Sequence, residues 1–243
     1  MNKRKYIRKQ EELLTLTRTD LKRHILIQKI KEFRLLDDDF MSKVFEDDIE
    51  CTEFLLHIIM GKSDLKVQDV RTQYSIKNLL GRFVRLDIHA IDDMQKKYNI
   101  EIQRADKGAG AKRARYNSSV IDANSLPAGV DFDELPETYV IFITEKDVIG
   151  GNLPIYHIER IVKEMEKPFN DEAHIIYVNG AYRDESPLGM LMHDFACSNP
   201  EDMHYKILAD KTRYFKESEK GVAAMCKMVE ELIDSDKKVH YVC

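Results

Sequence analysis

Two neighbouring segments near the middle of the chain, residues 85–92 and 98–103, alternate apolar and polar side chains with a period of two. This alternation is typical of β-strands that bury one face. The polar link between the segments is short enough for a hairpin. If the turn is centred near Met94, Asp87 lies directly opposite Glu101, and both side chains point to the polar face. The pattern therefore predicts an antiparallel pair of strands that carries two facing carboxylates.

The two predicted carboxylates lie close enough together to need a partner. Opposed residues of an antiparallel pair have Cβ atoms roughly 4.5–5.5 Å apart, and two carboxylates at that distance repel unless a cation or a proton lies between them. Mg²⁺ prefers oxygen ligands and commonly binds through one or two carboxylates, waters and substrate phosphates. We therefore expect a site for Mg²⁺, with Mn²⁺ as the alternative, formed by Asp87, Glu101 and the backbone carbonyl of Ile102. Gln103, on the same face, can orient a water molecule by a hydrogen bond.

A second interpretation of the same face needs no metal. Asp87, Glu101 and Gln103 can form an exposed, solvated sheet face, on which Arg85 and Arg104 act as salt-bridge partners. The alternation alone does not decide between the two interpretations, because both place the same side chains on one face.

Helical spacing of apolar residues surrounds the hairpin on both sides. Three acidic residues at 37–39 offer an N-cap and a favourable charge near a helix dipole. The expected helices cover residues 21–33, 40–49, 54–60, 111–123, 188–195, 202–215 and 221–233. Further strands are expected at residues 66–77, 139–143, 155–161 and 175–178. This order predicts an α/β core followed by a helical C-terminal region.

The chain divides into three parts on these patterns. Residues 1–35 form a charged N-terminal segment, residues 36–185 the core, and residues 186–243 a helical region that we expect to pack on the core. The composition is that of a globular protein, with 43% hydrophobic and 33% charged residues in a chain of 243. A chain of this length can bury a sizeable core.

The charge of the chain limits the kind of partner that it binds. A formal net charge of −5 argues against a uniformly basic nucleic-acid-binding protein, but local basic clusters occur at residues 3–9 and 104–115. Arg113, Arg115 and Tyr116 fall on the helix expected after the second strand. They form either a solvated helix face or a surface that contacts phosphates and bases.

Cysteine usage and the absence of long apolar runs indicate a compartment. The four cysteines have no CxxC spacing, which favours free thiols in a reducing compartment over a zinc site. The N-terminus lacks the apolar core of a secretory signal, and no apolar run reaches the length of about 18 residues that spans a bilayer. We therefore expect a cytoplasmic protein that does not enter a membrane.

An ordered set of segments resembles a known family. Asp87, followed across the hairpin by Glu101-Ile102-Gln103, resembles the core motif of the PD-(D/E)XK nuclease superfamily. More specifically, the chain is similar to the PD-(D/E)XK nuclease family transposases, which are related to the recombination-promoting nucleases. The matching segments are residues 38–41, 43–45, 85–87, 98–103, 113–116, 135–136, 139–143, 178–180 and 221–231. The resemblance thus covers nearly the full length after about residue 35.

The resemblance implies a restriction-endonuclease-like fold, with a central mixed β-sheet of about four or more strands flanked by helices. It assigns Asp87 to the motif aspartate, Glu101 to the second carboxylate and Gln103 to the position that usually holds lysine. An acidic residue on the early helix can complete the metal site of this family. Glu46 is the first candidate for that role and Asp39 the second.

The function implied by the resemblance is that of a transposase-associated, Mg²⁺-dependent DNA endonuclease that hydrolyses phosphodiesters. Nucleic acid would be contacted by Arg104, Arg113, Arg115 and Tyr116. A homodimer is an expectation by analogy, since nuclease folds that cut both strands often work as dimers. Two departures from the family pattern bear on activity: Arg-Leu-Asp stands in place of Pro-Asp, and Gln103 brings no positive charge. The alternatives are a catalytically inactive module that binds nucleic acid or a protein, and a nuclease that acts on RNA.

Overall fold

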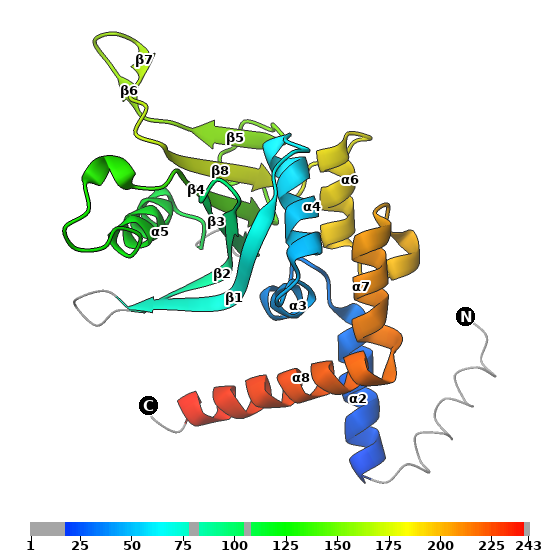
Figure 1. Cartoon of the computed structure of the whole chain (residues 1–243). Helices are drawn as coiled ribbons and strands as arrows, with labels where there is room; N and C mark the ends of the chain where they lie inside the picture. The colour runs from blue at the N-terminus through cyan, green and yellow to red at the C-terminus, as the bar shows by residue number, and fades with distance from the viewer. Residues whose placement is uncertain (1–17, 78–82, 105–107, 241–243) are drawn as a thin grey trace.

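A central mixed β-sheet organises the chain (Figure 1). The computed structural model describes residues 18–77, 83–104 and 108–240. Within these residues the main sheet has six strands in the order β1-β2-β3-β4-β8-β5. They are β1 (Val67–Lys77), β2 (Phe83–Asp92), β3 (Lys97–Gln103), β4 (Thr138–Thr144), β8 (Ala173–Asn179) and β5 (Ile155–Ile158). A separate two-stranded ribbon, formed by β6 (Ile161–Val162) and β7 (Lys167–Pro168), projects from the sheet.

Strand direction changes at the centre of the sheet. β1, β2 and β3 are antiparallel neighbours, whereas β3, β4 and β8 run parallel, and β5 pairs antiparallel with β8. β3 therefore lies between an antiparallel and a parallel neighbour. Its residues 98–102 are buried, polar positions included. Both faces of the sheet are thus covered at the position of the predicted site.

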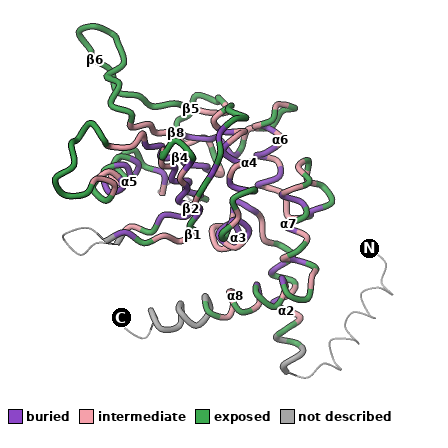
Figure 2. Tube along the Cα trace, in the orientation of Figure 1, coloured by how far each residue is buried: buried purple, intermediate pink, exposed green. Residues whose placement is uncertain are grey.

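Helices cover the two faces of the sheet (Figures 1 and 2). They are α2 (Arg18–Glu32), α3 (Asp38–Val44), α4 (Ile49–Met60), α5 (Ala111–Ala123), α6 (Pro187–Ala196), α7 (Lys206–Glu217) and α8 (Glu219–His240), with short 3₁₀ helices at Phe132–Glu134 and Pro200–Asp202. α5 packs on β4 and β8, and α3 and α4 pack on β1.

Each face of the sheet packs against its own buried apolar cluster. In the first cluster Phe40 of α3 and Leu55 of α4 join Ile141 of β4. In the second, Ile121 of α5 joins Phe142, the next residue of β4. Because successive strand residues point to opposite faces, the continuous apolar run of β4 supplies both clusters.

Lys216, near the end of α7, ties the helical C-terminal region to the core. The residue is 5% exposed, and its ammonium group donates hydrogen bonds to the carbonyl oxygens of Lys31 (3.0 Å), Phe33 and Ser198. Carbonyls at and beyond the ends of helices have no partner within the helix. Lys216 therefore satisfies carbonyls at the end of α2 and beyond the end of α6 with one buried cation.

We expect the substitution Lys216→Met to lower the free energy of unfolding by roughly 2–4 kcal/mol, because three carbonyls lose their common donor while the buried side chain nearly keeps its volume. The loss is measured as a lower denaturant midpoint. Lys206→Met is the matched control, since its exposed ammonium forms only a surface ion pair with Asp210. Equal midpoints for the two variants would contradict this role of Lys216.

The observed architecture confirms the predicted fold class: a mixed sheet flanked by helices, with helices at the C-terminal end. The expectation of one helix over residues 40–49 was wrong. α3 ends at Val44, Asp47 adopts φ 52°, and Asp48 starts α4 as an N-cap that accepts a hydrogen bond from the Cys51 N–H (2.9 Å).

One helix start differs from the sequence-based expectation, and two other expectations are not tested by the structure. The helix expected from residue 202 begins only at Lys206, because the 3₁₀ turn Pro200–Asp202 precedes it. The division at residues 35 and 185 stays a prediction, and the basic cluster at residues 3–9 lies outside the described residues. Across the residues that the structure describes, no helix is both long and apolar enough to cross a membrane.

Candidate active site

Asp87 and Glu101 face each other across β2 and β3. The paired residues Ile88 and Ile100 set the register, which puts the preceding Asp87 opposite the following Glu101. Asp87 is 5% exposed and Glu101 is 0% exposed. The predicted pairing of the carboxylates is therefore present, but the solvated face of the second interpretation is not.

The strands part at the carboxylate pair. The last paired residues of the β2–β3 ladder are Ile88 and Ile100, and beyond them each carboxylate accepts a hydrogen bond from a backbone N–H of the opposite strand. Asp87 Oδ2 accepts from the N–H of Ile102 at 3.0 Å, and the carboxylate of Glu101 accepts from the N–H of Asp87. These two bonds replace the regular backbone pairing of β2 and β3, which ends at Ile88 and Ile100, and they hold the carboxylates in position.

Arg113 of α5 neutralises one of the two carboxylates. Its guanidinium contacts Glu101 Oε2 at 2.8 Å, and a second nitrogen donates to the carbonyl of Gly108 at 3.2 Å. The side-chain amide of Asn99 donates to Glu101 Oε1 at 3.1 Å. Glu101 is thus held on both oxygens, and the Arg113 side chain, 43% exposed, reaches out toward solvent.

Burial makes the negative charge of the pair costly. It raises the pKa of Asp87 to about 7, and the nearby charges of Glu101 and Asp38 act in the same direction, against the Ile102 N–H and Arg113. Burial also raises the pKa of Glu101, with Arg113 and Asn99 opposing it. Carboxyl groups that resist ionisation in an apolar setting are typical of functional sites that await a cation or a substrate.

A cavity of about 470 Å³ opens onto Asp87, while Glu101 lies buried behind its wall, in contact with Arg113. Asp87 lines it together with Gln103, and α5 contributes Arg113 and Asn117. The N-terminal residue of α3, Asp38, lines the same cavity. Burial raises the pKa of Asp38, with Arg85 and Arg113 opposing the shift.

Asp38, and not Glu46, is the acidic residue of the early helix that lies beside the pair. Glu46 follows the end of α3, forms an exposed ion pair with Lys43 (2.6 Å) and lines a different cavity against α7. α3 ends at Val44 and Asp47 adopts a left-handed backbone, so Glu46, the first candidate from the family resemblance, lies outside this helix. Asp39, the second candidate, lines the cavity next to that of Asp38.

Gln103, the last residue of β3, lies against Gly108. A Cβ atom added at Gly108 would meet the amide end of Gln103, so a side chain at position 108 would displace the Gln103 amide. The same stretch of chain carries the carbonyl that Arg113 contacts. Gln103 and Arg113 are thus brought to one cavity wall from two different elements.

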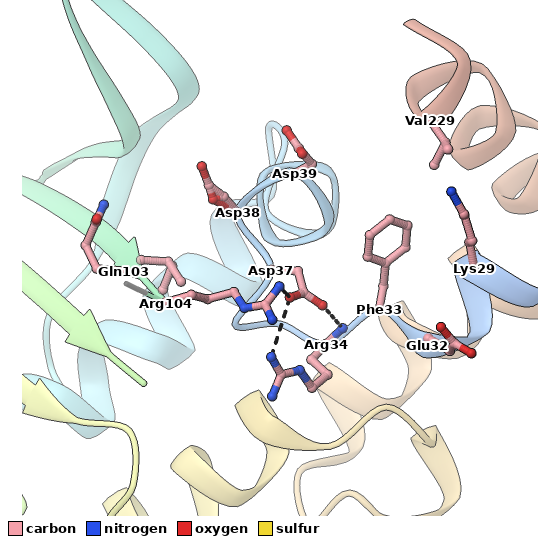
Figure 3. A pocket seen from close by; sticks show the side chains of 11 residues that line it. Lys29, Glu32, Phe33, Arg34, Asp37, Asp38, Asp39, Gln103, Arg104 and Val229 are labelled. Atoms are coloured by element: carbon pink, nitrogen blue, oxygen red, sulfur yellow. Dashed lines mark hydrogen bonds and ion pairs between the residues drawn. The ribbon is translucent and has the colours of Figure 1, made fainter. Parts of the chain in front are cut away.

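Adjoining cavities extend the site in both directions. Asp38 and Gln103 also line a larger cavity of about 780 Å³, shown in Figure 3, in which Asp37 lies between the backbone of Arg34 and the guanidinium of Arg104. Arg104 contacts Asp37 Oδ1 at 2.7 Å. The sequence-predicted Arg104 is therefore adjacent to the site, with its charge paired to a carboxylate.

On the other side, the outer face of α5 carries basic residues. Arg113 and Tyr116 line both the site cavity and a neighbouring one, where Lys112 and Arg115 join them. The structure thus brings Arg113 into the site itself and leaves Arg115 at its edge. Together the three cavities run from α2 and α3, across the end of β3, to α5.

The mixed sheet, its helical layers and the buried carboxylate pair where its central strands part define a restriction-endonuclease-like α/β protein. Residues 20–181 match the family model described as PD-(D/E)XK nuclease family transposase, and the chain belongs to this family. No curated protein and no solved structure matches the chain. The family supports a nuclease function associated with transposases, and its nucleases typically use divalent metals.

The residues of the site fit a hard divalent cation. The charges of Glu101 and Asp38 both raise the pKa of Asp87, and burial disfavours the charge of all three carboxylates. Oxygen-only ligands of this kind suit Mg²⁺ or Mn²⁺. Among the described residues, the amide nitrogen of Asn117 in the cavity wall is buried without a hydrogen-bond partner. Such an orphan donor suits a water molecule or a substrate oxygen.

Proposed function

We propose that the protein is a metal-dependent DNA endonuclease that hydrolyses phosphodiester bonds at the Asp87–Glu101 site. The observation that carries this proposal is the pair of facing, buried carboxylates, of which Asp87 lines an open cavity and has its pKa raised to about 7. Arg113 offsets the charge of Glu101, but the surroundings still raise the pKa of Asp87, which suits a further cation at this carboxylate. Membership of a nuclease family supports the same reaction class.

In the proposed site Asp87, Glu101, Asp38 and the carbonyl of Ile102 hold Mg²⁺ or Mn²⁺. When bound, such an ion lowers the pKa of a coordinated water and offsets negative charge on the scissile phosphate. The hydrogen bonds from Ile102 to Asp87 and from Asn99 to Glu101 hold the two carboxylates in place beside each other. This fixed geometry removes the cost of ordering the ligands when substrate binds.

Gln103 and Arg113 divide the work that a motif lysine performs. The amide of Gln103 accepts and donates hydrogen bonds, so it orients the attacking water. The guanidinium of Arg113 supplies the positive charge that an amide lacks, and its fork of N–H groups matches the oxygens of a phosphate. Its contact with Glu101 places that charge next to the proposed metal ligands.

The basic residues at both ends of the adjoining cavities support a nucleic-acid path across the site. Lys29, Arg34 and Arg104 line one end, and Lys112 and Arg115 line the other. The first end also carries the acidic residues Glu32, Asp37 and Asp39, so the end at Lys112 and Arg115 is the more basic one and suits the flank of a phosphodiester chain. A local basic surface of this kind suits a polyanion although the net charge of the chain is −5.

Plasmid nicking tests the proposal. Wild-type protein with Mg²⁺ or Mn²⁺ is expected to convert supercoiled plasmid to the nicked form, and EDTA or the substitution Glu101→Gln is expected to stop the conversion. Glu46→Gln is the matched control, because this carboxylate lies in a different cavity. Equal nicking by wild type and Glu101→Gln would remove the pair from the mechanism.

The same assay separates the alternatives. Salt-sensitive DNA binding without nicking in either metal would replace the endonuclease by an inactive binding module. Cleavage of RNA in preference to DNA would change the substrate but leave the assigned residues in place.

A further inference from the structure

A second group of side chains with metal-binding chemistry lies at the junction of α6 and α7. His193, Asp194 and His204 each offer one ligand atom, and these atoms all lie within 4.8 Å of one another. The group shares no residue with the cavities around Asp87 and Glu101. It is therefore independent of the proposed nuclease site.

Asp194 brings the group together. It lies in the last turn of α6, is 0% exposed, and accepts hydrogen bonds from the backbone N–H of His204 and of Tyr205, each at 2.8 Å. These bonds hold the residue before α7 against the end of α6. His193 Nδ1 lies 3.2 Å from the same carboxylate. Two imidazoles from different parts of the chain thus meet at one buried carboxylate.

The two imidazoles are placed to turn toward a common ion. Their ring centroids lie 4.6 Å apart with an angle of 63° between the rings. The His193 side chain is 39% exposed and His204 is exposed, so both rings can be reached from solvent. A carboxylate has about four lone-pair positions, so the bonds that Asp194 already accepts leave it able to bind a metal.

The hydrogen bonds to the start of α7 are a sufficient structural reason for a buried Asp194. They do not explain why an imidazole lies on each side of its carboxylate. Two imidazole nitrogens and one carboxylate oxygen form a ligand set typical of Zn²⁺, with a fourth position left for water. Mg²⁺ prefers oxygen ligands, which separates this site chemically from the pair at Asp87.

We propose that His193, Asp194 and His204 bind Zn²⁺ and clamp the start of α7 to the end of α6. The ion bridges residues ten positions apart and closes the loop that contains the 3₁₀ turn Pro200–Asp202. Because the site forms only in the folded chain, zinc binding stabilises the protein by linkage. This function is additional to phosphodiester hydrolysis and does not depend on it.

Calorimetric titration of Zn²⁺ into the EDTA-treated full chain, in excess Mg²⁺ that fills oxygen-rich sites, tests the proposal. Wild type is expected to bind one Zn²⁺, and free zinc ~100-fold above Kd is expected to raise Tm by roughly 5–10 °C. His193→Ala and His204→Ala are each expected to weaken zinc binding at least ~10-fold. His157→Ala is the matched control, because this exposed histidine on β5 lies outside the group.

Two outcomes would overturn the site. Zinc isotherms of the His193→Ala and His204→Ala variants that match wild type would show that any bound ion lies elsewhere. Co²⁺ added to wild type should give the visible absorption of a four-coordinate nitrogen–oxygen site, and the absence of those bands would refute the proposal without reference to any variant. Both histidines are exposed, so equal Tm values in EDTA check that the variants fold.

Discussion

Replacing Asp87 by asparagine is expected to reduce nicking by at least ~10²-fold and, in the metal-free protein at pH 8, to raise stability. Asparagine keeps an oxygen that accepts the 3.0 Å hydrogen bond from the Ile102 N–H. It removes a charge that burial and the neighbouring Glu101 disfavour. Loss of activity together with a gain in stability is typical of a residue kept for function, because purely structural residues destabilise when replaced.

The pH dependence of this gain has a definite sign. The pKa of Asp87 is about 7 in the folded protein and 3.8 for an ordinary aspartate, so the folded state holds the proton more tightly. The free energy of unfolding therefore has its full contribution from protonated Asp87 below about pH 4, and this contribution is lost as the pH rises to about 7. At pH 8 the gain of Asp87→Asn over wild type is roughly 1–3 kcal/mol, and it falls toward zero in acid.

Denaturant unfolding in EDTA at pH 5 and pH 8 measures the effect, and nicking with Mg²⁺ measures the activity. Glu46→Gln, which changes an exposed carboxylate outside the site, should leave both unchanged. A variant Asp87→Asn that is less stable than wild type at pH 8 would show that the carboxylate is a structural group. Nicking by this variant at the wild-type rate would remove Asp87 from the proposed mechanism.

The carboxylate pair was predictable from sequence because it depends only on local patterns. Period-two alternation fixes which side chains share a face, and the short polar link fixes the register. The observed pairing of Ile88 with Ile100 agrees with both. The same patterns could not reveal that the polar face is covered, since the covering helix α5 follows the strands in sequence and packs through tertiary contacts.

The third carboxylate of the site, Asp38, could not be identified from the sequence. Acidic residues occur at positions 37–39 and 46–48, and helical spacing cannot choose among them unless the end of the helix is known. α3 ends at Val44, and Glu46 beyond it lines a cavity against α7. Asp38 belongs to a segment that resembles the family, residues 38–41, but only the folded structure shows that it lines the cavity.

The substitution Arg113→Ala is expected to lower nicking by roughly 10²–10³-fold, the effect of removing one group that stabilises transition-state charge. It also leaves the fully buried Glu101 with Asn99 as its remaining side-chain partner, which we expect to cost roughly 1–3 kcal/mol of stability. Arg113→Lys should recover the stability better than the rate, because an ammonium group supplies charge without the planar fork. Nicking rates and denaturant midpoints measure the two effects separately.

The substitution Gln103→Lys tests whether the charge of Arg113 replaces that of the usual motif lysine. Gln103 and Arg113 line the same cavity, so the ammonium of Gln103→Lys can reach the region that Arg113→Ala vacates. The double variant is expected to nick faster than Arg113→Ala alone, whereas Gln103→Lys should add little to a chain that keeps Arg113. That non-additivity is the signature of two groups that serve one role. If Gln103→Lys gives the same factor in both backgrounds, Arg113 acts only by holding Glu101, and the positive charge at the phosphate must come from another residue.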